Sequence, residues 1–139
     1  MVEINNLTRS HVDKKLLKRV AQIVLRGENR KEAGLSVALI GSEKIKKLNK
    51  KYRGKNKITD VLAFSSGFQF PVSRLELGEV VICLQKVKKN TRKFGNSYKK
   101  ELARVLIHGI LHLLEYDHEE TKKKAEKMEK KQQYYLSKI

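Results

Sequence analysis

The segment from Ser97 to about Leu114 constrains the fold of this chain more than any other. Its apolar side chains recur at intervals of three and four residues, which predicts a helix with one face buried in the core: Leu102, Val105, Leu106, Ile110 and Leu113. Two of the four histidines, His108 and His112, lie on the same predicted helix. Residues four apart project from one face of a helix, with Cβ atoms about 5–6 Å apart. The sequence therefore predicts a firmly anchored pair of imidazoles.

A third histidine follows just beyond the predicted end of that helix. In the stretch HGILHLLEYDH, His118 comes ten residues after His108, and a turn over residues 114–117 would fold it back over the pair. Three histidines and one open position are typical of a catalytic zinc site. The alternative is two hydrogen-bonded core histidines and one surface histidine. The third histidine favours the metal, so we predict one zinc ion per chain, held by His108, His112 and His118.

The spacing of the three histidines equals that of the metzincin peptidases, H-E-x-x-H-x-x-G-x-x-H. In those peptidases the Glu after the first histidine is the general base, whereas this chain has Gly109 at that position. A zincin-type peptidase is therefore disfavoured. Zinc alone lowers the pKa of its bound water toward about 7, so hydrolysis of a different substrate stays open.

The charge of the chain predicts a polyanionic partner. Lys and Arg total 32 against 15 for Asp and Glu, a formal net charge of +17. A field of this sign attracts nucleic acid. The lysine-rich surfaces of some thermophiles balance lysine with glutamate, and that balance is missing here. A membrane surface is the weaker alternative, because the most basic segment lacks a strong apolar face with Trp or Phe.

The length of 139 residues predicts a single domain spanning residues 1–139. No segment approaches the roughly 20 consecutive apolar residues that a membrane span requires. Met1 leads directly into VEINN without a basic flank and apolar run, so we expect no signal or transit peptide and a cytoplasmic location. The single cysteine, Cys83, lies in the apolar run VVICL and is expected to pack as a small hydrophobe.

Strand and helix patterns follow one another along the chain and predict an α+β domain with a small β-sheet packed against several helices. The predicted strands are a short edge strand at MVEINN, then LSVALIG, DVLAFSS and ELGEVVICL. The other predicted helices are His11 to Arg26, SEKIKKLNKKYR with Ser42 as its cap, Gln85 to Phe94, and Glu119 to Ser137. In the last of these, one stripe is predicted to face inward: Ala125, Met128, Gln132, Tyr135 and Ile139.

Three stretches resemble the YbeY endoribonucleases, bacterial proteins implicated in rRNA maturation. HGILHLLEYDH is similar to that family's signature H-G-x-L-H-L-x-G-Y-D-H. LNKKYRGKNKITDVLAFSS resembles its N-x-x-Y-R segment followed by T-D-V-L-S-F, and LGEVVIC resembles its L-G-D-I-x-I-C. Together these stretches cover roughly half of the chain, and the histidine signature is the most specific of them.

The resemblance implies a zincin-like mixed sheet packed against helices. It implies a metal-dependent endoribonuclease that acts on single-stranded RNA in maturation of the rRNA of the small ribosomal subunit and in ribosome quality control. His108, His112 and His118 match the family's metal ligands, and Arg53 matches its functional arginine, which we predict to be catalytic. Without the resemblance, Arg53 is one surface arginine among many. A non-catalytic ribosome-assembly factor with a structural metal is the alternative from another class.

The sequence leaves the roles of three acidic residues near the predicted site undecided. Glu115 stands where the family has Gly, so it is either a surface side chain on an altered turn or, if the helix persists, a fourth ligand or a base. Asp60 and Asp117 either orient imidazoles by accepting their free N–H, or they open the strand DVLAF and cap the last helix.

Overall fold

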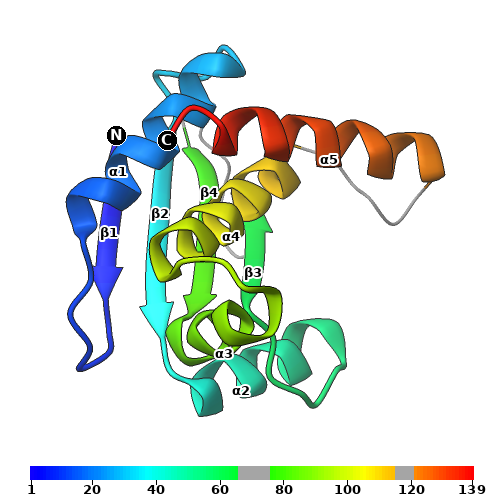
Figure 1. Ribbon diagram of the computed structural model, residues 1–139. Coiled ribbons are helices and arrows are strands. Elements are labelled where there is room, and N and C mark those ends of the chain that lie inside the picture. The colour runs from blue at the N-terminus through cyan, green and yellow to red at the C-terminus, as the bar shows by residue number, and fades with distance from the viewer. Residues whose placement is uncertain (66–75, 115–120) are drawn as a thin grey trace.

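The computed structural model describes residues 1–65, 76–114 and 121–139. They form a four-stranded sheet with helices on both faces, so the predicted α+β class is confirmed (Figure 1). Along the chain the elements are β1 (Val2–Asn6), α1 (Lys14–Gly27), β2 (Gly34–Ile40), α2 (Ser42–Arg53), β3 (Val61–Ser65), β4 (Glu76–Cys83), α3 (Leu84–Phe94), α4 (Tyr98–Leu113) and α5 (Lys122–Leu136).

The sheet is mixed, as predicted. Its strand order is β1-β2-β4-β3, with β1, β2 and β4 parallel and β3 antiparallel to β4. β1 is an edge strand, which confirms the interpretation of MVEINN. β2, one of the two inner strands, is apolar along nearly its whole length because both of its faces are covered.

The main core lies between the sheet and the helices α1, α4 and α5. α4 contacts α1, α3, α5 and the strands β3 and β4, so it is the central helix of this layer (Figure 1). Its inward side chains are completely buried: Leu106, Ile107, Ile110 and Leu111 are each 0% exposed. On the other face, α2 packs Ile45 into a smaller cluster with Leu62, Val81 and Cys83. Cys83 is buried, as expected for a small hydrophobe.

Several predicted helix starts differ from those observed; α5, for example, begins at Lys122, later than predicted. α1 begins at Lys14 and not at His11, because the Asp13 carboxylate accepts a hydrogen bond from the Leu16 amide at 3.1 Å and caps the helix. Ser42 is the first residue of α2 and not its cap, which is Gly41. The Ser42 amide and hydroxyl instead donate to the Gln85 side-chain oxygen, so this serine ties α2 to α3.

The inward stripe predicted for α5 is correct only in part. Met128, Gln132 and Tyr135 are buried, but α5 ends at Leu136, so Ile139 lies beyond the helix and is 38% exposed. Thr121 caps α5 by accepting from the Lys124 amide at 3.1 Å. No helix among the described residues is long and apolar enough to cross a membrane.

Candidate active site

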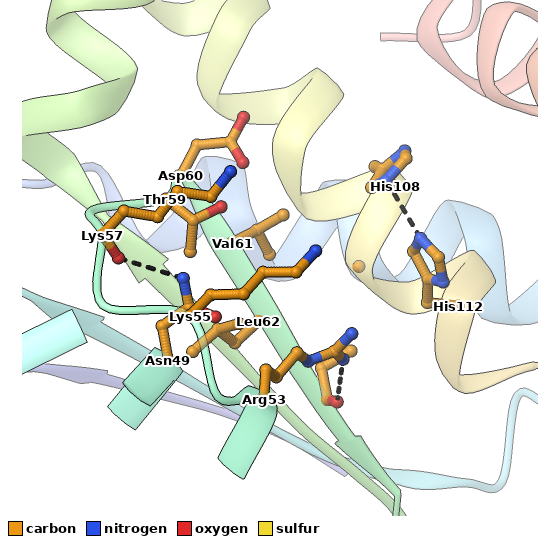
Figure 2. A pocket seen from close by; sticks show the side chains of 12 residues that line it. Asn49, Arg53, Lys55, Lys57, Thr59, Asp60, Val61, Leu62, His108 and His112 are labelled. Atoms are coloured by element: carbon orange, nitrogen blue, oxygen red, sulfur yellow. Dashed lines mark hydrogen bonds between the residues drawn. The ribbon is translucent and has the colours of Figure 1, made fainter. Parts of the chain in front are cut away.

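A cavity of about 220 Å³ opens between α4 and the connection from α2 to β3. Figure 2 shows the histidines of α4 on one side of it and a row of basic side chains on the other. The cavity brings together residues far apart in the sequence, and its lining consists of Asn49, Arg53, Lys55, Lys57, Thr59, Asp60, Val61, Leu62, Ala63, His108, Gly109 and His112.

His108 and His112 converge as their four-residue spacing predicts. The two Nε2 atoms lie 3.1 Å apart, and the ring centroids are 4.6 Å apart (Figure 2). Two nitrogens bound to one tetrahedral zinc ion at about 2.0–2.1 Å lie about 3.3 Å from each other. This separation lies within hydrogen-bond distance, and it is also short enough for one metal ion to bind both imidazole nitrogens.

Among the residues that the structure describes, Gln132 of α5 forms a hydrogen bond with His108 from outside α4. His108 Nδ1 lies 2.8 Å from the Gln132 side-chain oxygen, and Gln132 is only 4% exposed. The sequence pattern placed Gln132 on the buried stripe of α5 but gave it no role at the site. Neither periodicity nor spacing could identify this contact, because it joins two helices across 24 residues of sequence.

Asp60, one of the two residues considered as partners of an imidazole, makes different contacts. Its carboxylate lies 3.5 Å from the Asn90 amide nitrogen and 3.7 Å from the Arg104 guanidinium, and its backbone oxygen accepts from the Cys83 amide at 2.8 Å. Asp60 immediately precedes β3, in agreement with the interpretation that it opens that strand.

Arg53 lies on the wall of the cavity opposite the histidines. It is the last residue of α2, and Gly54 follows with φ of 70°, a left-handed conformation that ends the helix. Its guanidinium donates to the Ala63 backbone oxygen of β3 at 3.5 Å (Figure 2). Lys55 and Lys57 line the same wall, so this side of the cavity carries three positive charges on exposed residues.

Gly109 is explained by packing. A Cβ atom at this position would lie 2.6 Å from Val80 Cγ1 and 3.2 Å from Val61 Cγ2. α4 therefore approaches β3 and β4 too closely for any side chain here. Glycine is thus needed at position 109, where the metzincins have their general base, because α4 contacts the sheet there.

A buried ion pair supports α4 one to two turns before His108. Glu101 is 0% exposed. Its carboxylate accepts from Arg104 Nε, shared between both oxygens at 3.0 and 3.1 Å, from Arg104 Nη2 at 2.5 Å, and from the Asn96 side-chain amide at 3.2 Å. Burial raises the pKa of Glu101, but the bonds from Arg104 and Asn96 outweigh it, and the net pKa lies below the ordinary value of 4.5. This pair was not predicted, because its only signal in the sequence is the three-residue spacing within ELAR.

Three residues of the predicted site lie outside the described residues: His118, Glu115 and Asp117. Within the described ranges, no group of three His, Cys, Asp or Glu side chains is placed to hold a metal ion. Of the predicted site residues, His108, His112 and Arg53 therefore line one cavity in the described part of the chain.

Comparisons with known proteins identify relatives of this chain. A curated relative, an endoribonuclease YbeY from Thermodesulfovibrio yellowstonii, is 45% identical over 76% of this chain and 66% of its own length. Another, from Ruthia magnifica, is 39% identical over 100% of this chain and 96% of its own length. The solution structure of TM1509 from Thermotoga maritima has 34% identity and a TM-score of 0.64, covering 98% of this chain and 87% of that one.

An α+β domain with a histidine pair on its central helix and a basic wall opposite fits a hydrolase that acts on a polyanionic substrate. The model of one family, Endoribonuclease YbeY, matches residues 3–139. The chain belongs to the endoribonuclease YbeY family. This membership supports RNA cleavage and does not favour the metallopeptidase or the non-catalytic assembly factor.

Proposed function

We propose that this member of the endoribonuclease family cleaves single-stranded RNA with the help of one zinc ion held by His108, His112 and His118. The observation that carries the proposal is the convergence of the two Nε2 atoms, 3.1 Å apart, in a cavity that Arg53 also lines. Its biological substrate is the rRNA of the small ribosomal subunit during maturation and quality control, and its location is the cytoplasm.

When bound, zinc supplies Lewis acidity toward a phosphoryl oxygen and makes water a better nucleophile near neutral pH. The residues of the chain then have separate tasks. Arg53 donates from its planar guanidinium to the phosphate, where negative charge develops during cleavage. Lys55 offers a compact charge that binds the RNA backbone without fixing its orientation.

The basic surface of the whole molecule supports the same substrate. A net charge of +17 gives affinity for phosphates that does not depend on base sequence. The cavity is lined by three cationic side chains, Arg53, Lys55 and Lys57. Cations of this kind bind the phosphates of the RNA backbone more than the edges of its bases. Selection of a cleavage site is then expected to come from the single-stranded shape of the RNA.

The test replaces His108, His112 or His118 with Ala, one at a time, and measures zinc content and single-turnover cleavage of an rRNA fragment. Each change should remove most of the zinc and the cleavage, because a three-ligand site has no spare donor. His11→Ala is the matched control, since His11 is exposed and is not part of the cavity lining. Full zinc content in all three variants would overturn the metal assignment.

The assembly-factor alternative predicts a different response to a chelator. An enzyme should lose cleavage while its unfolding temperature and RNA affinity change little. Removal of a structural metal should instead lower the unfolding temperature. In that case no cleavage should be detected even before the chelator is added. The same samples incubated with a protein substrate test for peptidase activity, which we expect to be zero.

A further inference from the structure

We propose that Gln132 of α5 is a positioning residue that fixes the His108 imidazole with its Nε2 atom free to bind the metal. The inference rests on the proposed function, because it assigns a task to a residue next to the proposed metal ligands. Its basis is the 2.8 Å contact between His108 Nδ1 and the Gln132 side-chain oxygen, in a place where Gln132 is only 4% exposed.

The direction of this hydrogen bond selects one form of the histidine. An amide oxygen only accepts, so the hydrogen must lie on His108 Nδ1. Nε2 of a neutral His108 then carries the lone pair, and it is this atom that faces His112 Nε2 at 3.1 Å. The opposite tautomer would place a hydrogen where the metal must bind. Partners of this kind orient metal-binding histidines and raise their basicity.

The placement of Gln132 is determined from both sides along α5. Lys131 donates to the Glu28 carboxylate at 3.0 Å, and the Tyr135 hydroxyl donates to the same carboxylate. The Glu28 side chain is only 6% exposed, so the contact between the end of α1 and α5 is buried. Met128, one turn before Gln132, is 2% exposed in the core. α5 is therefore anchored on each side of the residue that meets His108.

The adjacent residue provides a matched control. Gln133 has the same side chain on the same helix, but it is exposed and its amide donates to Glu129 Oε1 within α5 at 3.0 Å. A substitution at Gln133 changes the helix as one at Gln132 does, and leaves His108 untouched. A difference between the two positions can then be assigned to the contact with the imidazole.

The experiment titrates the zinc-stripped full chain with zinc in a calorimeter for wild type, Gln132→Leu, Gln132→Glu and Gln133→Leu. Leu removes the acceptor and keeps an apolar volume, so we expect zinc affinity to fall by on the order of 10–100-fold. Glu restores an acceptor and should stay within about threefold of wild type or bind more tightly. Gln133→Leu should match wild type. Affinity of Gln132→Leu within about threefold of wild type would overturn the proposal.

A second readout does not need the metal. Nitrogen-15 NMR of zinc-stripped protein reports which ring nitrogen of His108 carries the hydrogen, and we expect Nδ1 in wild type and a mixture in Gln132→Leu. Hydrogen on Nε2 in the wild type would overturn the positioning role. If the wild type binds no zinc but shows Nδ1–H, the metal part of the proposed function fails and the role of Gln132 stands. Thermal unfolding of each variant confirms that it is folded.

Discussion

The two walls of the cavity are built in opposite ways. The histidine wall belongs to α4, whose Ile107 and Leu111, adjacent to the two histidines in sequence, are 0% exposed. The opposite wall consists of Arg53, Lys55 and Lys57, at the end of α2 and in the connection that follows, all on exposed residues. Two ligands of one metal must be held to within a few tenths of an ångström, and a packed helix does this. Cations that hold a flexible phosphate chain need reach and charge, and an exposed connection provides both.

We therefore expect substitutions on the histidine wall to alter metal affinity and the free energy of unfolding. Substitutions on the basic wall should instead alter RNA affinity and the cleavage rate. Arg53 is where the effect on turnover should be largest. Arg53→Lys and Arg53→Ala should both lower the single-turnover rate by on the order of 10²–10³, because Lys lacks the planar fork. Zinc content and RNA affinity should change little, since Arg53 is one of 32 basic residues.

The same two substitutions at Arg30 provide the control for Arg53. Arg30 is an exposed arginine between α1 and β2 and does not line the cavity. Its variants should cleave at the wild-type rate. If Arg53→Lys also cleaves at that rate, the contribution of Arg53 is that of a general positive charge; an unimpaired Arg53→Ala would remove it from the site.

Gly109→Ala should show how little space the histidine wall allows. The new methyl group would meet Val80 at 2.6 Å, so we expect the free energy of unfolding to fall by about 1–3 kcal/mol and zinc affinity to weaken. Gly41→Ala is the comparison: a Cβ there meets nothing within 4 Å, so only the smaller cost of losing a glycine N-cap of α2, about 0.5–1 kcal/mol, is expected. Chemical denaturation of wild type and both variants measures the change in the free energy of unfolding. Equal stability would mean that the contact between α4 and the sheet yields easily.

The Glu101–Arg104 pair predicts a pH effect on the stability of α4. The pKa of Glu101 is lowered in the folded chain, so its stabilisation is fully present above pH 4.5 and is lost as the pH falls through the folded-state pKa. Glu101→Gln should lower the free energy of unfolding near neutral pH by about 1–2 kcal/mol, and the difference from wild type should shrink below pH 4.5. Denaturation curves at several pH values test this. A difference that is constant from pH 7 to pH 3 would contradict it.

Lys55 should have the smallest effect. Lys55→Ala removes one phosphate-binding charge, so the slope of log affinity against log salt for single-stranded RNA should decrease by about 0.7. Cleavage at saturating protein should stay within a few-fold of wild type. Lys31→Ala, an exposed lysine outside the cavity lining, is the control and should leave the slope nearly unchanged. Identical slopes for both variants would place the RNA elsewhere on the surface.

Features set by interactions between residues close in sequence could be predicted, whereas features set by contacts between distant residues could not. The spacing of His108 and His112 is a local property of one helix, and their convergence was predicted correctly. The contact between Gln132 and His108 depends on how α5 docks on α4, and the closeness of Gly109 to Val80 depends on how α4 docks on the sheet. Packing between elements leaves no periodic pattern in the sequence. Gln132 was therefore predicted only to be buried, and Gly109 was noted only as the absence of a general base.

Errors at the ends of helices have a similar cause. The apolar pattern from His11 to Arg26 extends past the true start of α1, because the Asp13 cap and not the pattern sets that start. Ser42 was assigned as a cap because serine favours that position, but its hydrogen bonds go to Gln85, 43 residues away. Ile139 fits the stripe of α5 by spacing alone, and the helix ends before it. In each case a side-chain contact or a chain end overrides the local preference.

If the histidine wall holds a metal that faces the basic wall, anomalous scattering at the zinc absorption edge will locate it in crystals of the full chain grown with zinc. We expect one strong peak within bonding distance of the Nε2 atoms of His108 and His112, on the side of the cavity opposite Arg53. A peak bound elsewhere, or none in crystals that contain zinc in solution, would contradict this expectation.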